Sequence, residues 1–402
     1  MNNKVYYGEY TLRHWINLIL KKNIILPDYQ RYFVWDQNKA KELIKAFKEK
    51  QFIPPVTIGN FKSEKESINL ILDGQQRLTS ILLAYIGYFP NKMINQKELK
   101  FMDENDNLIE DEGINNILEW NFNELLKNGS TKEEIKENLS YENYIKFDFN
   151  VGKDFFDNNF LGFSYLVPLL ANDKEQQKFY SKVFRSINIQ GESLLALESR
   201  AALYYLDKDL EDYFIPKFIE KIYVNDSKVD FVRYLALLSQ YKKEKTADEL
   251  GKRFAGKMEK YYEEYIYFTV GEEDSNIFIK YSEVFKDKKE YEKMYINLKE
   301  SLKKLELLKK YGSIIDVDIT LFGLIYFIVF EKKEIDYSKK ESIIKEINKE
   351  IEKIRREDTK HVKNPAAFKY LRYRVRRSIE IYERYIKWVS MINLFWCQWI
   401  LY

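Results

Sequence analysis

A chain of 402 residues is longer than one ordinary hydrophobic core accommodates, which predicts two domains or one domain with a large helical extension. The apolar fraction of 45% indicates a globular protein, and the single cysteine, Cys397, excludes an internal disulfide framework and fits a reducing compartment. The 66 basic residues nearly balance the 63 acidic ones, leaving a net charge of +3, so the overall charge points to neither nucleic acid nor membrane. Any such partner must be bound by a local patch.

The first ninety residues alternate between helical and extended patterns. The apolar spacing predicts helices over 11–22 and 37–50, capped by Thr11 and Asp36. The stretch IILPDYQRYFVW between them reads as extended, and VTIGNF and INLILD read as strands. This part of the sequence therefore predicts a compact mixed α/β unit.

The remainder of the chain becomes progressively more helical. Polar residues with weak periodicity over about 91–160 suggest a helical insertion with loops, followed by a strand at 165–170 and a helix at 175–188. Beyond 205 nearly every segment has helical period and few prolines. We expect an α+β protein with a mixed N-terminal domain over 1–206 and a mostly α-helical domain over 207–402.

No segment is typical of a membrane span or a secretion signal. The N-terminus lacks a signal-peptide pattern, and the longest apolar run, at 321–330, is half of the roughly 20 residues that a bilayer-spanning helix needs. We expect this run to form a buried helix in a cytoplasmic protein. The tail 388–402 carries three tryptophans and suggests either a terminal helix docked on the core or an interfacial or partner-binding helix.

The stretch LILDGQQRLTS places polar side chains at a turn from strand to helix. If Leu78 begins the buried face of the helix, then Gln75, Gln76 and Arg77 occupy its first turn, where free N–H groups and the helix dipole favour an anion. The Arg77 guanidinium suits phosphate, and the glutamines add neutral donors. Asp73 suits a metal, a ribose hydroxyl or Arg77 itself. In the alternative interpretation Asp73 merely caps the helix and Arg77 is solvated.

Two further segments carry polar side chains among apolar ones. Gln30 and Arg31 interrupt the aromatic segment PDYQRYFVW, so one of them faces inward unless Arg31 lies on an edge strand. In NIQGESLLALESR, Glu198 falls on the apolar face of an expected helix and needs a partner, for which Arg31, Arg77 or a metal are available. Gly191 permits close approach of a ligand, and Asn188 can bond to it. The alternative is a structural pair of Glu198 with an arginine.

The segment FKYLRYRVRRSIEIYERY at 368–385 interleaves arginines with tyrosines. DNA-contacting helices show this pattern, so the segment is a candidate phosphate-binding surface, although neighbouring acidic residues fit a solvated, tyrosine-packed helix as well. The arginines concerned are Arg372, Arg374, Arg376 and Arg377.

Four segments, in this order, resemble the N-terminal domain of GmrSD-type (type IV) restriction proteins: IILPDYQRYFVW, FIPPVTIGNF, LILDGQQRLTSILLAY and VFRSINIQGESLLALESR. The resemblance covers about residues 8–206. It implies a ParB/sulfiredoxin-like fold and a module that binds and hydrolyses a nucleoside triphosphate in modification-dependent antiphage restriction. We expect Mg²⁺ to accompany the nucleotide.

The resemblance also implies roles for individual residues. Residues 73–77 would form the nucleotide-phosphate site, and Gln30 and Arg31 would line the same pocket or sense DNA. We extend the expected nucleotide site to Thr79, Asn188, Gly191 and Arg200. Asp73, Arg77 and Glu198 are the expected catalytic residues, and Asp73 or Glu198 would hold the metal.

The sequence departs from full-length members of this family in its histidines. A His-Asn-His nuclease domain needs histidine as base and metal ligand, but this sequence has only His14, expected on a surface, and His361, expected in a loop. We therefore expect a sensor and NTPase that acts with DNA, such as modified phage DNA, and that could assemble as a homo-oligomer. Cleavage would need a separate nuclease subunit or be absent. The alternative is a non-enzymatic DNA-binding or partner-binding module in which DGQQR binds a phosphate without turnover.

Overall fold

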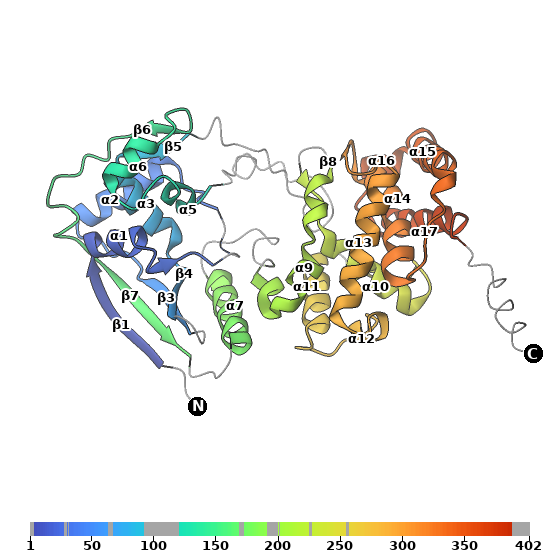
Figure 1. Cartoon of the computed structure of the whole chain (residues 1–402), viewed down its shortest axis with the longest axis horizontal. Coiled ribbons are helices and arrows are strands. Elements are labelled where there is room, and N and C mark those ends of the chain that lie inside the picture. The colour runs from blue at the N-terminus through green and yellow to red at the C-terminus, as the bar shows by residue number, and fades with distance from the viewer. Residues whose placement is uncertain are drawn as a thin grey trace, which may run out of the picture. The chain divides into compact units, whose positions relative to one another are not determined.

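The computed structural model describes residues 4–27, 30, 32–62, 67–91, 120–168, 173–190, 200, 202–224, 227–254 and 257–387. These residues divide into two compact units, which we call unit 1, up to Glu211, and unit 2, from Asp212 onward. In Figure 1 unit 1 runs from blue to green, and unit 2 continues to red. Unit 1 is mixed and unit 2 is mainly helical, which confirms the predicted α+β class.

A five-stranded mixed sheet forms the framework of unit 1. Its strands lie in the order β1-β7-β3-β4-β2, with the neighbours antiparallel, parallel, antiparallel and parallel in turn. The bounds of these strands are Lys4–Thr11 for β1, Phe160–Val167 for β7, Val56–Lys62 for β3, Ser67–Asp73 for β4 and Ile24–Ile25 for β2. A separate antiparallel pair joins β5 (Tyr88–Pro90) to β6 (Tyr144–Lys146).

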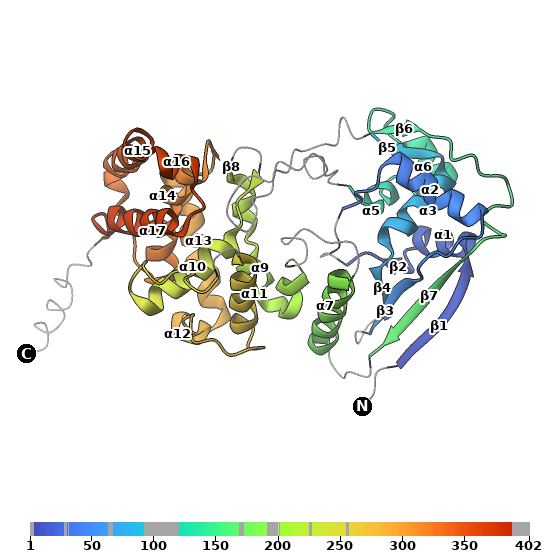
Figure 2. The ribbon, with the colours of Figure 1, turned by 180° about the vertical axis from the view of Figure 1, so that it is seen from behind.

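Helices cover both faces of this sheet (Figures 1 and 2). The helices that form the main core are α1 (Leu12–Leu20), α2 (Gln37–Lys48), α3 (Gln75–Ile86), α5 (Phe122–Leu126) and α6 (Lys132–Asn138). On the opposite face lies α7 (Asp173–Gln190), whose Tyr180 hydroxyl donates to the carbonyl of Asn60 in β3 at 2.6 Å. Two short 3-10 helices, η1 (Ala202–Leu206) and η2 (Lys208–Leu210), follow.

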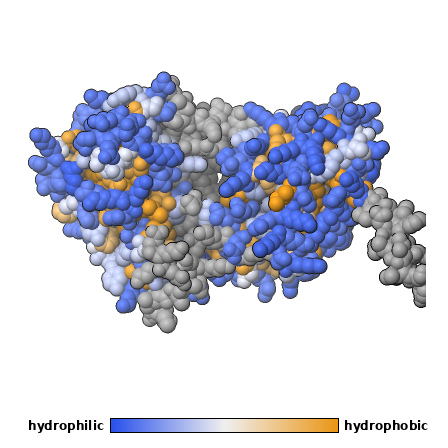
Figure 3. Space-filling view, in the orientation of Figure 1, coloured by the Kyte–Doolittle hydropathy of each residue, from blue (hydrophilic) through white to orange (hydrophobic). Residues whose placement is uncertain are grey.

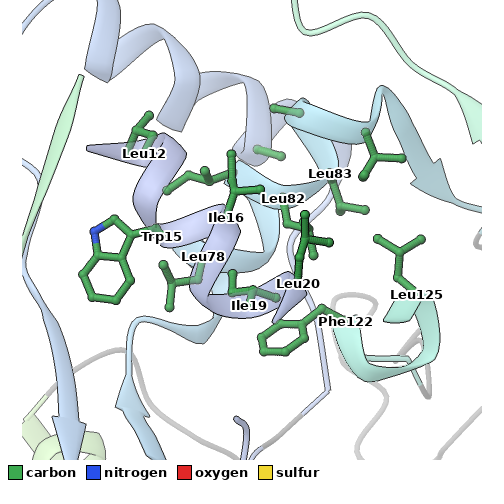
Figure 4. Close-up of a cluster of buried hydrophobic side chains, with 14 of the residues drawn as sticks. Leu12, Trp15, Ile16, Ile19, Leu20, Leu78, Leu82, Leu83, Phe122 and Leu125 are labelled. Carbon is green, nitrogen blue, oxygen red and sulfur yellow. The ribbon is translucent and has the colours of Figure 1, made fainter. Parts of the chain in front are cut away.

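Helices α1 and α3 pack against each other at the centre of the core (Figure 4). Leu12, Trp15 and Ile16 are fully buried, and each such large side chain contributes about 1.5–3 kcal/mol relative to an exposed one. Thr11 caps α1 by accepting from the His14 amide at 3.1 Å. The helix predicted over 11–22 and its cap are therefore confirmed.

Unit 2 is built from helices around α14 (Ile314–Ile325), which continues into the π-helix η4 (Tyr326–Phe330). This confirms the buried helix predicted at 321–330. The other helices are α9 (Glu211–Phe214), η3 (Lys217–Lys221), α10 (Phe231–Glu244), α11 (Met258–Thr269), α12 (Tyr281–Val284), α13 (Lys288–Lys304), η5 (Tyr337–Lys339), α15 (Lys340–Glu357), α16 (Thr359–Lys363) and α17 (Phe368–Glu383). A small sheet orders its strands as β10 (Lys310–Tyr311), β8 (Tyr223–Val224) and β9 (Ser227–Lys228).

Helices α14 and α17 approach closely at Gly323. A Cβ atom there would lie 2.3 Å from the Ser378 carbonyl oxygen, so only glycine fits without a shift of backbone. The Ser378 hydroxyl accepts from the Gly323 amide and donates to the Ile319 carbonyl, each at 2.7 Å. This contact brings Arg374 of α17 beside Asp318 of α14.

Asp318 anchors a fully buried ionic network in unit 2. It accepts two hydrogen bonds from Arg233, at 2.7 and 2.8 Å, one from Arg374 at 2.8 Å, and one from the Tyr234 hydroxyl at 2.8 Å. Burial alone would raise the pKa of Asp318, but the charges of Arg233 and Arg374 outweigh it and hold that pKa below its ordinary value. The carboxylate is therefore held ionised, and its negative charge faces both guanidinium groups.

His361 lies in the short helix α16 rather than in the predicted loop, and its side chain is buried beside this network. Its ring stacks on Tyr370 at 4.4 Å, and its Nε2 lies 3.0 Å from Nη1 of Arg374. Burial, followed by the charge of Arg374, lowers the pKa of His361 to about 4, against the weaker opposite effects of Asp358 and Asp318. The histidine is thus neutral in the folded protein.

Acid should therefore destabilise unit 2 through His361. The unfolded chain binds a proton near pH 6.5 and the folded chain near pH 4, so stability is complete above pH 6.5 and falls between these values. We expect a loss on the order of 2–3 kcal/mol in the free energy of unfolding across this window. Urea unfolding from pH 7 to 4 should show a shallower decline for His361→Gln than for the wild type; equal slopes would contradict the assignment.

The surface of the described residues is mostly hydrophilic, with smaller apolar areas on both units (Figure 3). Within this described part of the chain, no helix combines the length and apolarity that crossing a bilayer requires. The tail 388–402, with its predicted helix, lies outside the described residues.

Candidate functional site: the N-terminus of α3

Strand β4 passes into α3 through Gly74, which has a left-handed conformation with φ 92°. A Cβ atom at Gly74 would lie 2.9 Å from Cγ2 of Val56 and 3.1 Å from Nη2 of Arg77, so a side chain here would be both strained and crowded. Unlike Thr11 and Asp36, which cap α1 and α2, Gly74 offers no capping side chain. The first-turn N–H groups of α3 are therefore left to bind an external acceptor such as an anion.

Asp73 does not cap α3; it forms an ion pair with Arg77, with 2.6 Å between Oδ2 and Nη2. The same Nη2 lies 3.4 Å from the Pro55 carbonyl oxygen. The Arg77 side chain is only 14% exposed, which excludes the alternative of a solvated first-turn arginine. Its buried Nε has no hydrogen-bond partner within the part of the chain that the structure describes.

Gln76 is buried and bonds to the segment Tyr32–Trp35 rather than facing outward. Its Oε1 accepts from the amides of Val34 at 3.0 Å and Trp35 at 3.3 Å, and its Nε2 donates to the Tyr32 carbonyl at 2.9 Å. All its polar atoms are thus used within the protein. The structure gives Gln76 a role in holding this segment, a role that sequence reasoning missed because the partners lie more than 40 residues away.

Gln30 lies at the end of β4, next to the same turn. Its Nε2 donates to the carbonyls of Ile71 at 2.8 Å and Leu72 at 3.3 Å. These bonds place Gln30 beside the end of β4, which leads into the turn at 73–77, and its expected role in a nucleotide pocket stays a prediction. Arg31 lies outside the described residues.

Gln75 and Thr79 are buried polar residues one turn apart on α3. Gln75 is 3% exposed and Thr79 is 0% exposed. Gln75 Oε1 accepts from Gln76 Nε2 at 3.1 Å, whereas Gln75 Nε2 and Thr79 Oγ1 have no partner among the described residues. A buried donor without a partner is costly, so this helix turn favours a ligand or water that accepts from it.

The remaining predicted residues of this site are only partly visible. Gly191 and Glu198 lie outside the described residues, as does the side chain of Asn188. Arg200 is buried, and its Nε donates to the Tyr204 hydroxyl at 3.1 Å. No group of three or more His, Cys, Asp or Glu side chains suited to a metal occurs among the residues that the structure describes.

The four arginines of α17 that the sequence offered for DNA contact all bond to other groups of unit 2. Arg374 is fully buried on Asp318, which is incompatible with its predicted contact to DNA, because a buried guanidinium has no surface to offer a phosphate. Arg372 donates twice to the Leu250 carbonyl, at 3.0 and 2.8 Å. Arg376 pairs with Asp248, and Arg377 lies between Glu350 and Glu380. Any DNA contact here requires breaking these pairs.

Comparison with known protein families gives a match for the N-terminal part of the chain. Residues 12–205 match the family described as GmrSD restriction endonuclease, N-terminal domain. Residues 12–205 form a GmrSD N-terminal domain. This domain contains the whole DGQQR turn and the Gln76 contacts.

Other comparisons are more limited. An uncharacterized protein of Methanocaldococcus jannaschii is 35% identical over 116 residues, which cover 23% of this chain and 20% of that relative. The chain therefore matches only a fifth of the relative's length. No solved structure matches the chain.

Proposed function

We propose that this chain is the nucleoside-triphosphate-binding and hydrolysing sensor subunit of a modification-dependent restriction system that acts with DNA. The observation that carries the proposal is the uncapped N-terminus of α3, where Gln75 Nε2 and Arg77 Nε are buried donors without a partner among the described residues. The GmrSD N-terminal domain supports a place in restriction and an interaction with DNA. Its ParB/sulfiredoxin-like fold remains part of the proposal.

The side chains of the turn suggest how they would act. First-turn N–H groups and Arg77 would bind the phosphate oxygens, since backbone amides and guanidinium groups are the usual donors to phosphate. A phosphate that engages Arg77 would compete with Asp73, whose carboxylate would then be available to orient water. The same carboxylate would hold Mg²⁺, which supplies charge neutralisation in phosphoryl transfer.

The second candidate is a module that binds a phosphate without turnover. It is favoured by one observation: Asp73, the carboxylate at the turn, is already paired with Arg77 at 2.6 Å. In either case DNA cleavage would come from a separate nuclease subunit or be absent, since residues 1–402 contain two histidines and His361 is buried against Arg374. Assembly of the chain into a homo-oligomer belongs to the same proposal.

Asp73→Asn should separate the two candidates. Removing the carboxylate frees Arg77, so triphosphate binding without Mg²⁺ should be retained or strengthened, by up to about 10-fold. If Asp73 holds the metal or water, phosphate release with Mg²⁺ should fall by on the order of 100-fold or more. Calorimetry and phosphate release would be measured on the same preparations.

Asp157→Asn is a matched control, because Asp157 pairs with Arg13 at 3.2 Å on the surface of the same unit. This variant should leave both measurements unchanged. Normal turnover by Asp73→Asn would remove Asp73 from the catalytic residues. Binding that persists in a wild type without turnover would favour the phosphate-binding module.

A further inference from the structure

The segment from Tyr32 to Trp35 crosses the start of α3 without belonging to a helix or strand. Several of its backbone N–H and C=O groups form hydrogen bonds with residues outside the segment. Gln76 bonds to three of them, and the Phe33 amide donates to the Trp120 carbonyl at 2.8 Å. The Phe33 side chain is fully buried in the core. The position of the segment therefore depends on the first turn of α3.

Gln76 connects the first turn of α3 with the segment Tyr32–Trp35. Its backbone lies in the first turn of α3, whose N–H groups would bind the phosphate in the proposed function, and its side chain holds Val34 and Trp35. A small rotation of this turn, such as one that aligns the N–H groups with a phosphate, would displace the Gln76 amide and the segment bonded to it. Because three partly buried hydrogen bonds of 2.9–3.3 Å join the two parts, we expect them to move together.

We propose that Gln76 is a positioning residue that couples occupation of the α3 N-terminus to the position of the segment Tyr32–Trp35. The coupling is reciprocal: a ligand that moves the segment changes the affinity at the turn, and a ligand at the turn moves the segment. This inference rests on the proposed function, since it takes a nucleotide as the ligand at the turn. It adds a regulatory element that is distinct from phosphate contact.

Trp35 provides a reporter inside the coupled segment. Its indole is partly buried, its Nε1 has no hydrogen-bond partner among the described residues, and Lys39 Nζ lies 5.2 Å from the ring centre. A displacement of the segment changes this environment. In full-length protein labelled with 5-fluorotryptophan, the Trp35 resonance would be assigned by its loss in Trp35→Phe.

The experiment titrates each of the four NTPs with Mg²⁺ and follows the Trp35 ¹⁹F resonance, with binding measured in parallel by calorimetry. We expect the resonance to shift on saturation in the wild type. In Gln76→Met, which keeps the side-chain length but removes the polar contacts, the affinity for nucleotide should change and the shift at saturation, as set by calorimetry on the same variant, should fall below about half. Ser80→Ala is the matched control, since Ser80 is buried on the same helix and donates to the Gln76 carbonyl, not to the segment; its shift should equal that of the wild type.

The possible outcomes are distinguishable. Binding by calorimetry with an unmoved Trp35 resonance overturns the coupling and leaves the proposed function standing. An equal Trp35 shift in wild type and Gln76→Met overturns the role of Gln76. Absence of binding for all four NTPs in the wild type overturns the proposed function and the coupling with it. If Gln76→Met does not fold, the response of wild-type Trp35 still decides whether turn and segment are coupled.

Discussion

Arg77→Gln should strongly weaken nucleotide binding and with it turnover, while leaving the protein folded. Arg77 is the one cation of the α3 first turn, and loss of a charge-assisted contact to phosphate in a partly buried site costs roughly 2–3 kcal/mol, or about 30- to 150-fold in affinity. Asp73 keeps 39% of its side chain exposed, so water can solvate the carboxylate once the guanidinium is removed. Calorimetry with each NTP and a phosphate-release assay measure the two effects.

Arg13→Gln is the control for this substitution. Arg13 also pairs with an aspartate in unit 1, at 3.2 Å, and is 31% exposed, but it lies at the start of α1 rather than at the turn. Both variants should shift the free energy of unfolding by no more than about 1 kcal/mol. Equal nucleotide binding by wild type and Arg77→Gln would contradict the assignment of Arg77 to the phosphate site.

Asp318→Asn should produce the largest loss of stability among the substitutions considered. The change removes the anion that bonds to both Arg233 and Arg374, whose side chains are 5% and 0% exposed, and leaves both charges buried without it. Breaking a buried pair in this way costs about 3–5 kcal/mol. Urea unfolding of the full chain, followed by circular dichroism, should show the helical signal lost at a much lower urea concentration.

Asp316→Asn is the matched control because it lies two residues away on the same helix. Its partner, Arg355, is 51% exposed, so the pair at 2.7 Å is solvent-screened and should contribute no more than about 1 kcal/mol. A loss in Asp318→Asn as small as in Asp316→Asn would show that the buried network is not held by the charge of Asp318.

Local patterns in the sequence predicted much of unit 1. The helices over 11–22 and 37–50 and the strands VTIGNF and INLILD correspond to α1, α2, β3 and β4, because apolar spacing and capping residues act within a few residues. Strand β1 was not predicted. Its residues Lys4–Tyr10 are all exposed at the edge of the sheet, so the alternation that marks a half-buried strand is absent.

Contacts between distant residues limited the prediction of side-chain roles. The position of Gln76 in the first turn of α3 is readable from the sequence, but its bonds to Tyr32 and Val34 depend on how the segment folds back. The arginines of α17 followed a nucleic-acid pattern, yet the partner of Arg374 lies 56 residues away in α14. A charge pattern along one helix does not reveal which carboxylates the fold places opposite it.

The most direct test of the central claim is phosphate release from ATP, GTP, CTP and UTP by the wild-type chain and Arg77→Gln, with and without modified phage DNA. The account predicts turnover of at least one nucleotide by the wild type, a response to DNA, and loss of both in Arg77→Gln. Absence of turnover with every nucleotide, while DNA is still bound, would contradict it and leave the α3 turn as a phosphate-binding element without catalysis.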